Sequence, residues 1–226
     1  MALIDLSGMI EAGMWHYAGI PPVEIKQVTS IEADGSEAHS FTLTTISGTY
    51  LETAAHHFHG HPTIDDIPAE RLICDAAILH VGEKAPAQAV TVEDLERTAE
   101  GVDIRHGDAL IIATGWDRMW NAPNFVDDSP YLTMEAMRWI VAHGVSILGG
   151  DMPCFDNPRG GAGVNHVLFE SHALILAPLV NLKSLTQPRV RLMAFPLKIK
   201  GVCGAPCRVI VEETPVYTKQ SEEESL

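Results

Sequence analysis

The chain has 226 residues, 46% hydrophobic and 20% charged, with 15 Lys and Arg against 30 Asp and Glu, so its formal net charge is −15 at pH 7. This size and composition are typical of a globular protein with one large domain or two small ones. The acidic balance argues against nucleic-acid binding and against docking on anionic membranes, because both need a basic surface.

Export signals are not recognisable in the sequence. No basic residue precedes Lys26, and the most apolar stretch, residues 173–180, is far too short to span a bilayer. The four cysteines do not suggest an extracellular disulfide framework. We therefore expect a cytoplasmic protein with reduced thiols. Cys203 and Cys207 are expected to be buried core thiols, because a structural zinc site needs four ligands and no second pair lies nearby.

Several short runs are typical of strands, in that they are apolar and bounded by turn residues. The threonine-rich run at residues 40–46 alternates between apolar and polar residues. In chain order, the expected strands are residues 40–46, 76–81, 109–113, 145–148, 173–177, 190–200 and 208–212.

Three helices are expected between these strands. Thr91 and Asp94 form a capping signal for the first helix. Thr133 is expected to cap the second, with Gly144 in the left-handed position just past its end. A third helix is expected at residues 165–172. Strands that outnumber and mix with helices predict a single α/β domain with a mixed sheet and flanking helices. We expect this domain to cover residues 1–217, followed by an acidic tail at 218–226.

Residues 46–61 are the most informative segment for chemistry. They read ISGTYLETAAHHFHGH, with histidines at 56, 57, 59 and 61. If the segment is extended, Tyr50, Glu52 and His56 project from the same face. Histidine is the side chain best suited to proton transfer near neutral pH, and a nearby carboxylate can orient it. The alternative interpretation is a polar loop that is simply rich in histidine.

Blocks of residues along nearly the whole chain resemble a known family. They are IDLS at 4–7, SGT at 47–49, TIDDIP at 63–68, GDALIIATGW at 107–116, GGD at 149–151, NHVL at 165–168, LVNL at 179–182, PLKIKG at 196–201 and GAPCR at 204–208. Their order and spacing resemble the cyclase superfamily, typified by bacterial kynurenine formamidase. The resemblance implies a swivelling β/β/α fold, a small-molecule substrate, and a homodimer or homotetramer.

The family's metal-binding signature is degenerate in this chain. The signature is H-x-G-T-H-x-D-x-P-x-H, in which the first two histidines and the aspartate bind metal and the last histidine is the acid/base. At the matching positions this chain has Ile46, Tyr50, Glu52 and His56. An isoleucine has no lone pair to offer, and a neutral phenol is a poor ligand.

Two further ligands of the family lie later in the chain. The later histidine matches His166, whereas the later glutamate falls at Ala177 or Pro178. Because a catalytic zinc normally has three protein ligands, we predict that the family's metal pair is absent and that no metal cofactor is needed. A relocated zinc or manganese site built from His57, His59, His61 or His172 remains open.

The retained residues therefore predict metal-independent acid/base catalysis. His56 is the expected acid/base, Glu52 its orienting carboxylate, and Tyr50 a donor for a developing oxyanion. His166 is a second acid/base or a substrate contact. Such a site suits ring closure, dehydration, isomerisation or ring-opening hydrolysis of a small carbonyl compound. The alternatives are a metal-dependent amide or lactone hydrolase with rearranged ligands, and a non-catalytic paralogue that binds a small molecule.

Four more residues are expected to contact the substrate. In the family, an aromatic residue of the N-terminal loop covers the substrate, which points to Trp15 and Tyr17 here; packing at a subunit contact is the alternative. Trp116 and Asp151 each follow a predicted strand. Loops at strand ends often line functional sites, although a packed tryptophan fits the sequence equally well.

Overall fold

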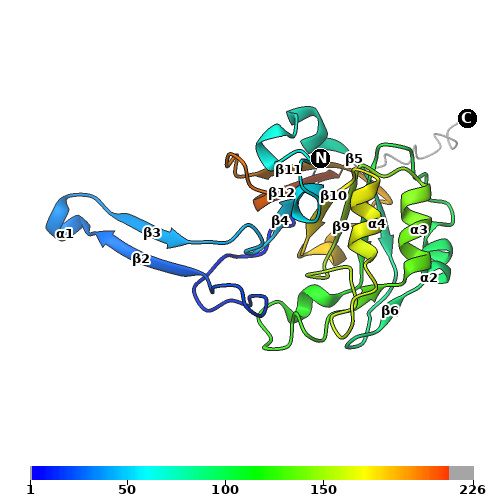
Figure 1. Cartoon of the computed structure of the whole chain (residues 1–226), viewed down its shortest axis with the longest axis horizontal. Helices are drawn as coiled ribbons and strands as arrows, with labels where there is room; N and C mark the ends of the chain where they lie inside the picture. The colour runs from blue at the N-terminus through cyan, green and yellow to red at the C-terminus, as the bar shows by residue number, and fades with distance from the viewer. Residues whose placement is uncertain (1, 214–226) are drawn as a thin grey trace, which may run out of the picture.

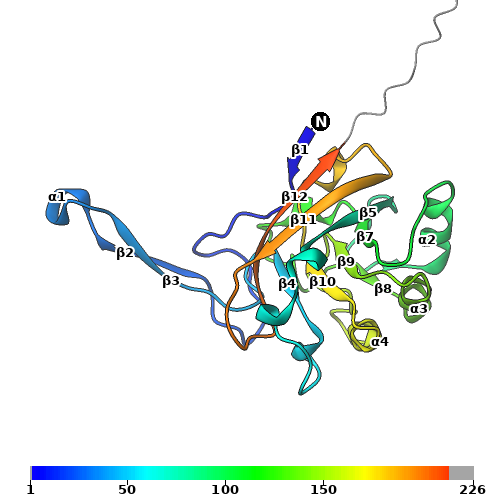
Figure 2. The ribbon, with the colours of Figure 1, turned by 90° about the horizontal axis from the view of Figure 1, so that it is seen from above.

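The structure is a computed structural model that describes residues 2–213. Its centre is an eight-stranded mixed sheet in the order β1-β12-β11-β5-β7-β9-β10-β4, and β4 also pairs with β12. This additional pairing closes the sheet into a barrel-like arrangement (Figure 2). The strands are β1 (Ala2–Asp5), β4 (Tyr50–Glu52), β5 (Ile73–His80), β7 (Ala109–Ala113), β9 (Ile147–Gly150), β10 (Leu174–Ala177), β11 (Arg189–Pro196) and β12 (Gly204–Glu213).

Four strands, β5, β7, β9 and β10, run parallel, and the remaining pairings of the sheet are antiparallel. Every residue of β7 and of β9 is buried, as expected of parallel strands covered on both faces. The predicted strands at 76–81, 109–113, 145–148, 173–177, 190–200 and 208–212 are confirmed, with shifted ends. The mixed α/β sheet with flanking helices is confirmed too.

Three helices, α2 (Val92–Ala99), α3 (Met134–Ala142) and α4 (Val164–Glu170), lie together on one side of the sheet (Figure 1). Thr91 and Asp94 form the predicted capping box at the start of α2. Thr133 caps α3 by accepting from the backbone N–H of Ala136, and Gly144 has a φ of 66° just past the helix. Local capping residues therefore determine where these helices begin and end.

A long hairpin projects from the body of the molecule (Figure 1). It consists of β2 (Glu24–Thr29), the single turn α1 (Ile31–Asp34) and β3 (Ala38–Thr42), and we call residues 24–42 the arm. Its two strands pair only with each other within residues 2–213. The predicted strand at 40–46 is therefore correct only for its first residues, and it belongs to the arm and not to the central sheet.

The remaining elements are short. Strands β6 (Ala89–Val90) and β8 (Tyr131–Leu132) pair with each other. No helix within residues 2–213 has the length and apolar character needed to cross a membrane. The acidic tail expected at 218–226, and the end of the expected domain at 217, lie outside the described residues. The 3-10 turns are η1 (Ala54–His56), η2 (Ile64–Asp66), η3 (Ala69–Leu72), η4 (Trp116–Met119) and η5 (Leu182–Ser184).

Candidate active site

Glu52 and His56 meet where strand β4 turns into the 3-10 turn η1. The expectation of one extended segment is wrong beyond Glu52, because Thr53 caps the turn by accepting from the backbone N–H of Ala55. The turn folds the chain back, so that His56 Nδ1 lies 3.1 Å from Glu52 Oε1. The predicted pairing of these two residues is thus present, but a turn and not a strand face brings them together.

Burial governs the charge of this pair. The Glu52 side chain is only 5% exposed, and its Oε1 has no well-aligned hydrogen-bond partner. Loss of water around the carboxyl raises the pKa of Glu52 to about 8. Desolvation, and then the neighbouring His57, lower the pKa of His56. The short contact would be an ion pair only if both groups were charged, and burial opposes both charges. We therefore treat the pair as neutral at pH 7.

Cys203 is a member of this centre that the sequence did not reveal. Its Sγ lies 3.5 Å from His56 Nδ1, and burial raises the pKa of its thiol. The backbone N–H and the hydroxyl of Thr53 both donate to the Cys203 carbonyl, at 2.8 and 3.0 Å. These bonds fix Cys203 beside the turn. Of the two thiols expected in the core, Cys207 is buried, whereas Cys203 is partly exposed and faces His56.

Tyr50 lies deeper, next to Tyr17. Their hydroxyl oxygens are 3.0 Å apart, and both lie within hydrogen-bond distance of the Pro153 carbonyl, at 3.0 Å for Tyr50 and 2.5 Å for Tyr17. Desolvation raises the pKa of both phenols well above the usual value, so they stay neutral donors. Because Tyr50 already donates to a protein carbonyl, an oxyanion would have to compete with that bond.

A second thiol lies on the same side of the site. Burial raises the pKa of Cys154, and the Asn165 side-chain amide donates to its Sγ at 3.3 Å. The other amide atom, Asn165 Oδ1, is buried and has no hydrogen-bond partner among residues 2–213. Sequence reasoning did not place Asn165 in the site, since only the fold brings the start of α4 against the loop after β9.

His166, the second predicted acid/base, is one ring removed from His56. The His56 and His57 ring centres are 4.8 Å apart, and those of His57 and His166 are 5.4 Å apart. Phe58 packs on His166 at 4.4 Å. The three imidazoles therefore form a row in which His57 separates His56 from His166.

Two of the four residues predicted to contact the substrate, Trp116 and Asp151, make hydrogen bonds inside the protein instead. Trp116 is completely buried, and its indole N–H donates to the Phe125 carbonyl at 2.9 Å. Asp151 is also completely buried, and its carboxylate accepts from Thr114 and from the backbone N–H of Trp116. These bonds hold the Thr-Gly-Trp turn after β7. We therefore do not place Trp116 or Asp151 in the candidate site.

The other two predicted contacts belong to one aromatic cluster. Trp15 packs edge-on against Tyr17, with ring centres 5.7 Å apart, and also against Trp120 and Phe125. Only Tyr17 reaches the buried polar groups around Tyr50. Trp15 therefore packs against the Tyr17 ring and does not contact these polar groups itself.

The family's metal positions do not fit a metal in this chain. Ile46 packs against the hydrophobic core, and the Tyr50 hydroxyl is bound to Tyr17 and Pro153. A relocated site made from His57, His59, His61 and His172 is not present among the described residues either. Within residues 2–213, the group of three that could hold an ion is Glu52, His56 and Cys203.

A cavity of about 440 Å³ opens beside this group. Cys203 forms part of its wall, and Phe58 supplies an aromatic surface. Its volume is in the range of small-molecule sites. Glu52 and His56 do not line it themselves, so Cys203, whose Sγ lies 3.5 Å from His56 Nδ1, connects the cavity with the pair. Its other lining residues are Thr45, Ala55, His59, Gly60, His61, Thr63, Gly201 and Val202.

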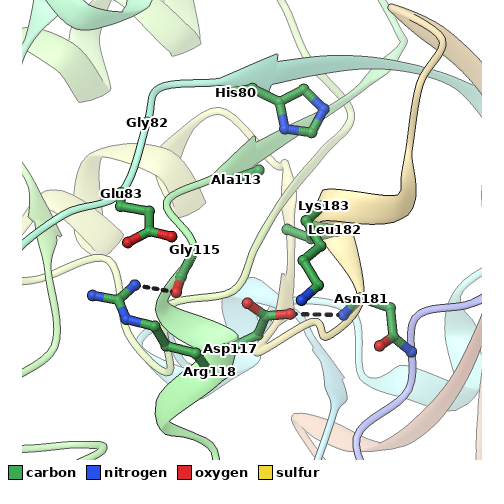
Figure 3. Close-up of a pocket in the computed structure, with 10 residues that line it drawn as sticks. All are labelled: His80, Gly82, Glu83, Ala113, Gly115, Asp117, Arg118, Asn181, Leu182 and Lys183. Atoms are coloured by element: carbon green, nitrogen blue, oxygen red, sulfur yellow. Dashed lines mark hydrogen bonds between the residues drawn. The ribbon is translucent and has the colours of Figure 1, made fainter.

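Another cavity, of about 400 Å³, lies where strands β5 and β7 end (Figure 3). Two of its charged side chains, Asp117 and Arg118, make hydrogen bonds that hold the surrounding loops. The Asp117 carboxylate accepts from the backbone N–H of Asn181 at 2.8 Å, and the Arg118 guanidinium donates to the carbonyls of Gly115 and Lys84. None of Glu52, His56 and Cys203 lines this cavity, whereas Cys203 lines the cavity described above, so we do not assign the chemistry to it.

Comparison with known proteins identifies the family. Residues 4–157, more than half of the chain, match the Cyclase family, described as putative cyclases. The chain belongs to this family. Two curated relatives are similar over most of their length. An isatin hydrolase of Roseibium aggregatum is 26% identical over 215 residues, covering 84% of this chain and 81% of that protein. A kynurenine formamidase of Salinibacter ruber is 27% identical over 226 residues, covering 95% and 99%.

Solved structures of cyclase-family proteins confirm the fold. An isatin hydrolase bound to the product analogue thioisatinate superimposes with a TM-score of 0.82 at 20% identity, covering 92% of this chain and 91% of that one. A potential metal-dependent hydrolase with cyclase activity superimposes with a TM-score of 0.77 at 21% identity, covering 95% and 99%. The sequence-based assignment to the cyclase superfamily is therefore confirmed.

Proposed function

We propose that this cyclase-family protein is a hydrolase that cleaves the C–N bond of a small amide, with His56 as the acid/base group and without a metal ion. The observation that supports the proposal most is the 3.1 Å contact between the buried Glu52 carboxyl and the exposed His56 imidazole, near a cavity that Cys203 lines. Both curated relatives have the names of hydrolases. Metal independence is proposed because Ile46 and Tyr50 occupy ligand positions of the family and offer no suitable donor.

At pH 7 the pair is neutral, with Glu52 protonated and His56 uncharged. It would act as the base after losing one proton from this state. His56 Nδ1–H then donates to the Glu52 carboxylate, and the lone pair of Nε2 accepts a proton from water. The oxygen of that water attacks the carbonyl carbon. When the C–N bond breaks, Nε2–H returns the proton to the leaving nitrogen. The products are a carboxylic acid and an amine, and the pair ends in its starting state.

An amide attached to an aromatic ring is the substrate class that we propose. Isatin is a cyclic amide fused to a benzene ring, and the name kynurenine formamidase denotes cleavage of a formamide. Such amides have better leaving groups than alkyl amides, so a base without a Lewis acid can act on them. In this chain, Phe58 lines the cavity and can stack on an aromatic ring.

The test is hydrolysis of isatin and of N-formylkynurenine by protein that has been dialysed against a chelator. We expect His56→Ala to lower kcat/KM by about 10²–10⁴-fold, the usual contribution of a general acid/base. His39→Ala on the exposed arm is the matched control and should retain the activity. Equal activity of the His56 variant would reject this role. Absence of turnover with all amides and lactones tested would favour the non-catalytic paralogue.

Other reactions of the family use the same base. Ring closure, dehydration and isomerisation also move a proton next to a carbonyl, and a free lone pair on His56 could serve each of them. Product mass separates them. Ring-opening hydrolysis of a cyclic amide adds one water, and hydrolysis of a formamide splits it into formate and an amine, whereas ring closure or dehydration removes one water and isomerisation leaves the mass unchanged. We favour hydrolysis because the names of both curated relatives denote it.

A metal-dependent hydrolase with rearranged ligands is the second candidate. The observation that favours it is the Glu52, His56 and Cys203 group. Its distinguishing feature is loss of activity on chelation and recovery on adding back the ion. Full activity in chelator-treated protein, with less than about one ion per several chains by elemental analysis, would exclude it.

A further inference from the structure

Three atoms of different chemistry converge beside the cavity. They are Glu52 Oε1, His56 Nδ1 and Cys203 Sγ, and all lie within 4.8 Å of one another. Oxygen, imidazole nitrogen and thiolate sulfur are the donors that zinc takes in proteins. A soft sulfur among the donors disfavours magnesium and calcium, which prefer oxygen alone.

The spacing of the donors suits a tetrahedral ion. Bonds of about 2.0 Å to oxygen and nitrogen and about 2.3 Å to sulfur place nitrogen about 3.3 Å from oxygen and about 3.5 Å from sulfur. The structure has 3.1 Å between His56 Nδ1 and Glu52 Oε1, and 3.5 Å between His56 Nδ1 and Cys203 Sγ. The third pair, Glu52 Oε1 and Cys203 Sγ, lies within 4.8 Å. Closing this pair to about 3.5 Å would bring all three donors onto one ion.

The carboxyl oxygen is also short of a partner. Glu52 Oε1 is buried, and apart from the neighbouring imidazole nothing in the described structure offers it a hydrogen bond. A buried acceptor without a well-aligned donor carries a free-energy cost that a bound cation would remove. The unsatisfied oxygen lies beside His56 Nδ1, so this observation and the donor spacing concern the same atoms and indicate the same ligand.

We propose that Glu52, His56 and Cys203 bind one thiophilic divalent cation, with Zn²⁺ as the best fit, and that the bound ion switches off the base function of His56. The binding half of this inference rests on the geometry alone, whereas the inhibitory half rests on the proposed function. The site shares one position with the family's metal ligands, since Glu52 matches the aspartate of the signature, but His56 and Cys203 supply the other donors and Ile46 and Tyr50 take no part.

Inhibition follows from the tautomer of the imidazole. An ion on Nδ1 of His56 forces the remaining ring proton onto Nε2, so Nε2 has no lone pair to accept a proton from water. The same ion occupies the Glu52 carboxylate that would orient the ring. Cys203 loses its S–H proton and Glu52 its carboxyl proton on binding. At pH 7 each ion therefore releases about two protons, and the affinity rises with pH.

Cobalt(II) titration tests the binding half. Chelator-treated protein is titrated with Co²⁺, and the near-ultraviolet absorption of a cobalt–thiolate bond is followed. We expect saturation at one ion per chain and displacement by Zn²⁺. Cys203→Ser should abolish the band and weaken Zn²⁺ binding by at least about tenfold. Absence of the band in the unmodified protein, or an undiminished band in Cys203→Ser, would overturn the site.

Matched variants make the assignment specific. Cys207→Ser changes a buried thiol four residues away in β12 and should keep both the band and the affinity. Glu52→Gln keeps the side-chain volume but removes the anionic donor, so it should keep the sulfur band and bind Zn²⁺ more weakly. Calorimetry in two buffers should show the release of about two protons, and about one in Glu52→Gln.

Hydrolysis under the same titration tests the inhibitory half. We expect the rate to fall as the cobalt band rises, and to return when a chelator is added. Cys203→Ser should resist the same Zn²⁺ concentration. A rate that rises with the band would overturn inhibition and establish the metal-dependent candidate. A band without any hydrolysis at any metal content would support the binding site while rejecting the proposed function.

Discussion

At the scale of single residues, the buried carboxyl of Glu52 controls how stability depends on pH. Its usual pKa of 4.5 rises to about 8 in the folded protein. Between these values the folded state holds more protons than the unfolded state. The free energy of unfolding therefore falls as pH rises from about 4.5 to 8, by on the order of 1.4 kcal/mol for each unit of pKa difference. Glu52 stabilises the protein only when it is protonated.

Glu52→Gln isolates this contribution. Glutamine has the same shape and does not ionise in this range, so the variant should gain stability relative to the unmodified protein as pH rises from 5 to 8.5. Urea unfolding at pH 5, 6.5 and 8.5 measures the difference. Because other titrating groups, such as Asp151, are present in both proteins, they cancel in the comparison. A difference that does not change with pH would show that Glu52 is ionised in the folded state.

The same two residues determine the pH profile of catalysis. The base form of the pair appears as its first proton leaves, so kcat/KM should rise with pH and level off above about 8. In Glu52→Gln, His56 titrates without the carboxyl. Burial lowers the pKa of His56 below its usual 6.5, so the profile should move to lower pH while its plateau falls. An unchanged pH profile in the variant would show that Glu52 takes no part in the reaction.

Sequence reasoning found the residues of the site that are close to one another in the chain. His56 and Glu52 are four residues apart, and the family signature singles out both positions. Cys203 lies 147 residues from His56, and Asn165 reaches Cys154 from another element. The first contact depends on the register between β4 and β12, and the second on how α4 packs against the loop after β9, and one sequence determines neither. Trp116 was expected in the site because a strand end alone does not distinguish a packed tryptophan from a lining one.

At the scale of elements, the turn η1 at the end of strand β4 brings His56 back against Glu52. Thr53 holds it with three bonds: its hydroxyl accepts from the Ala55 N–H and donates to the Cys203 carbonyl, to which its own N–H also donates. The helices α2 and α3 were predicted well because their caps are local. The turn was not predicted, because β4 pairs with its neighbours only over residues 50–52, and tertiary pairing ends the strand.

Thr53→Val tests whether this turn positions the catalytic pair. Valine keeps the volume but removes both hydroxyl bonds, so we expect a loss of about 1–3 kcal/mol of stability and a fall in kcat with little change in KM. Thr133→Ala, which removes the cap of α3 away from the site, should cost about 1 kcal/mol and leave kcat unchanged. A matching fall in kcat in both variants would mean that general destabilisation, and not positioning, is responsible.

At the scale of the whole molecule, the arm is the feature that a single chain does not explain. An isolated two-stranded hairpin is only marginally stable in water. The arm nevertheless exposes Ile31 and Phe41, each 64% exposed. It carries the acidic residues Glu24, Glu32, Asp34 and Glu37. A groove where the arm meets the body is lined by Phe41 of the arm and by apolar residues of the body, including Phe195 and Leu197. Its charged lining residues, Asp5 and Arg208, pair with each other, and the turn after β11 carries Lys198 and Lys200.

The homodimer or homotetramer expected from the family resemblance would use these two surfaces together. The apolar residues of the arm would pack on the apolar groove of a second copy, with the acidic residues near its Lys198 and Lys200, and a two-fold arrangement forms the contact twice. We expect light scattering to give at least twice the chain mass of 24.6 kDa. Ile31→Glu places a charge in the apolar contact and should shift the protein toward monomer, whereas Glu32→Gln next to it should not. A monomer for the unmodified chain at micromolar concentration, or equal association of both variants, would show that the arm does not join two copies.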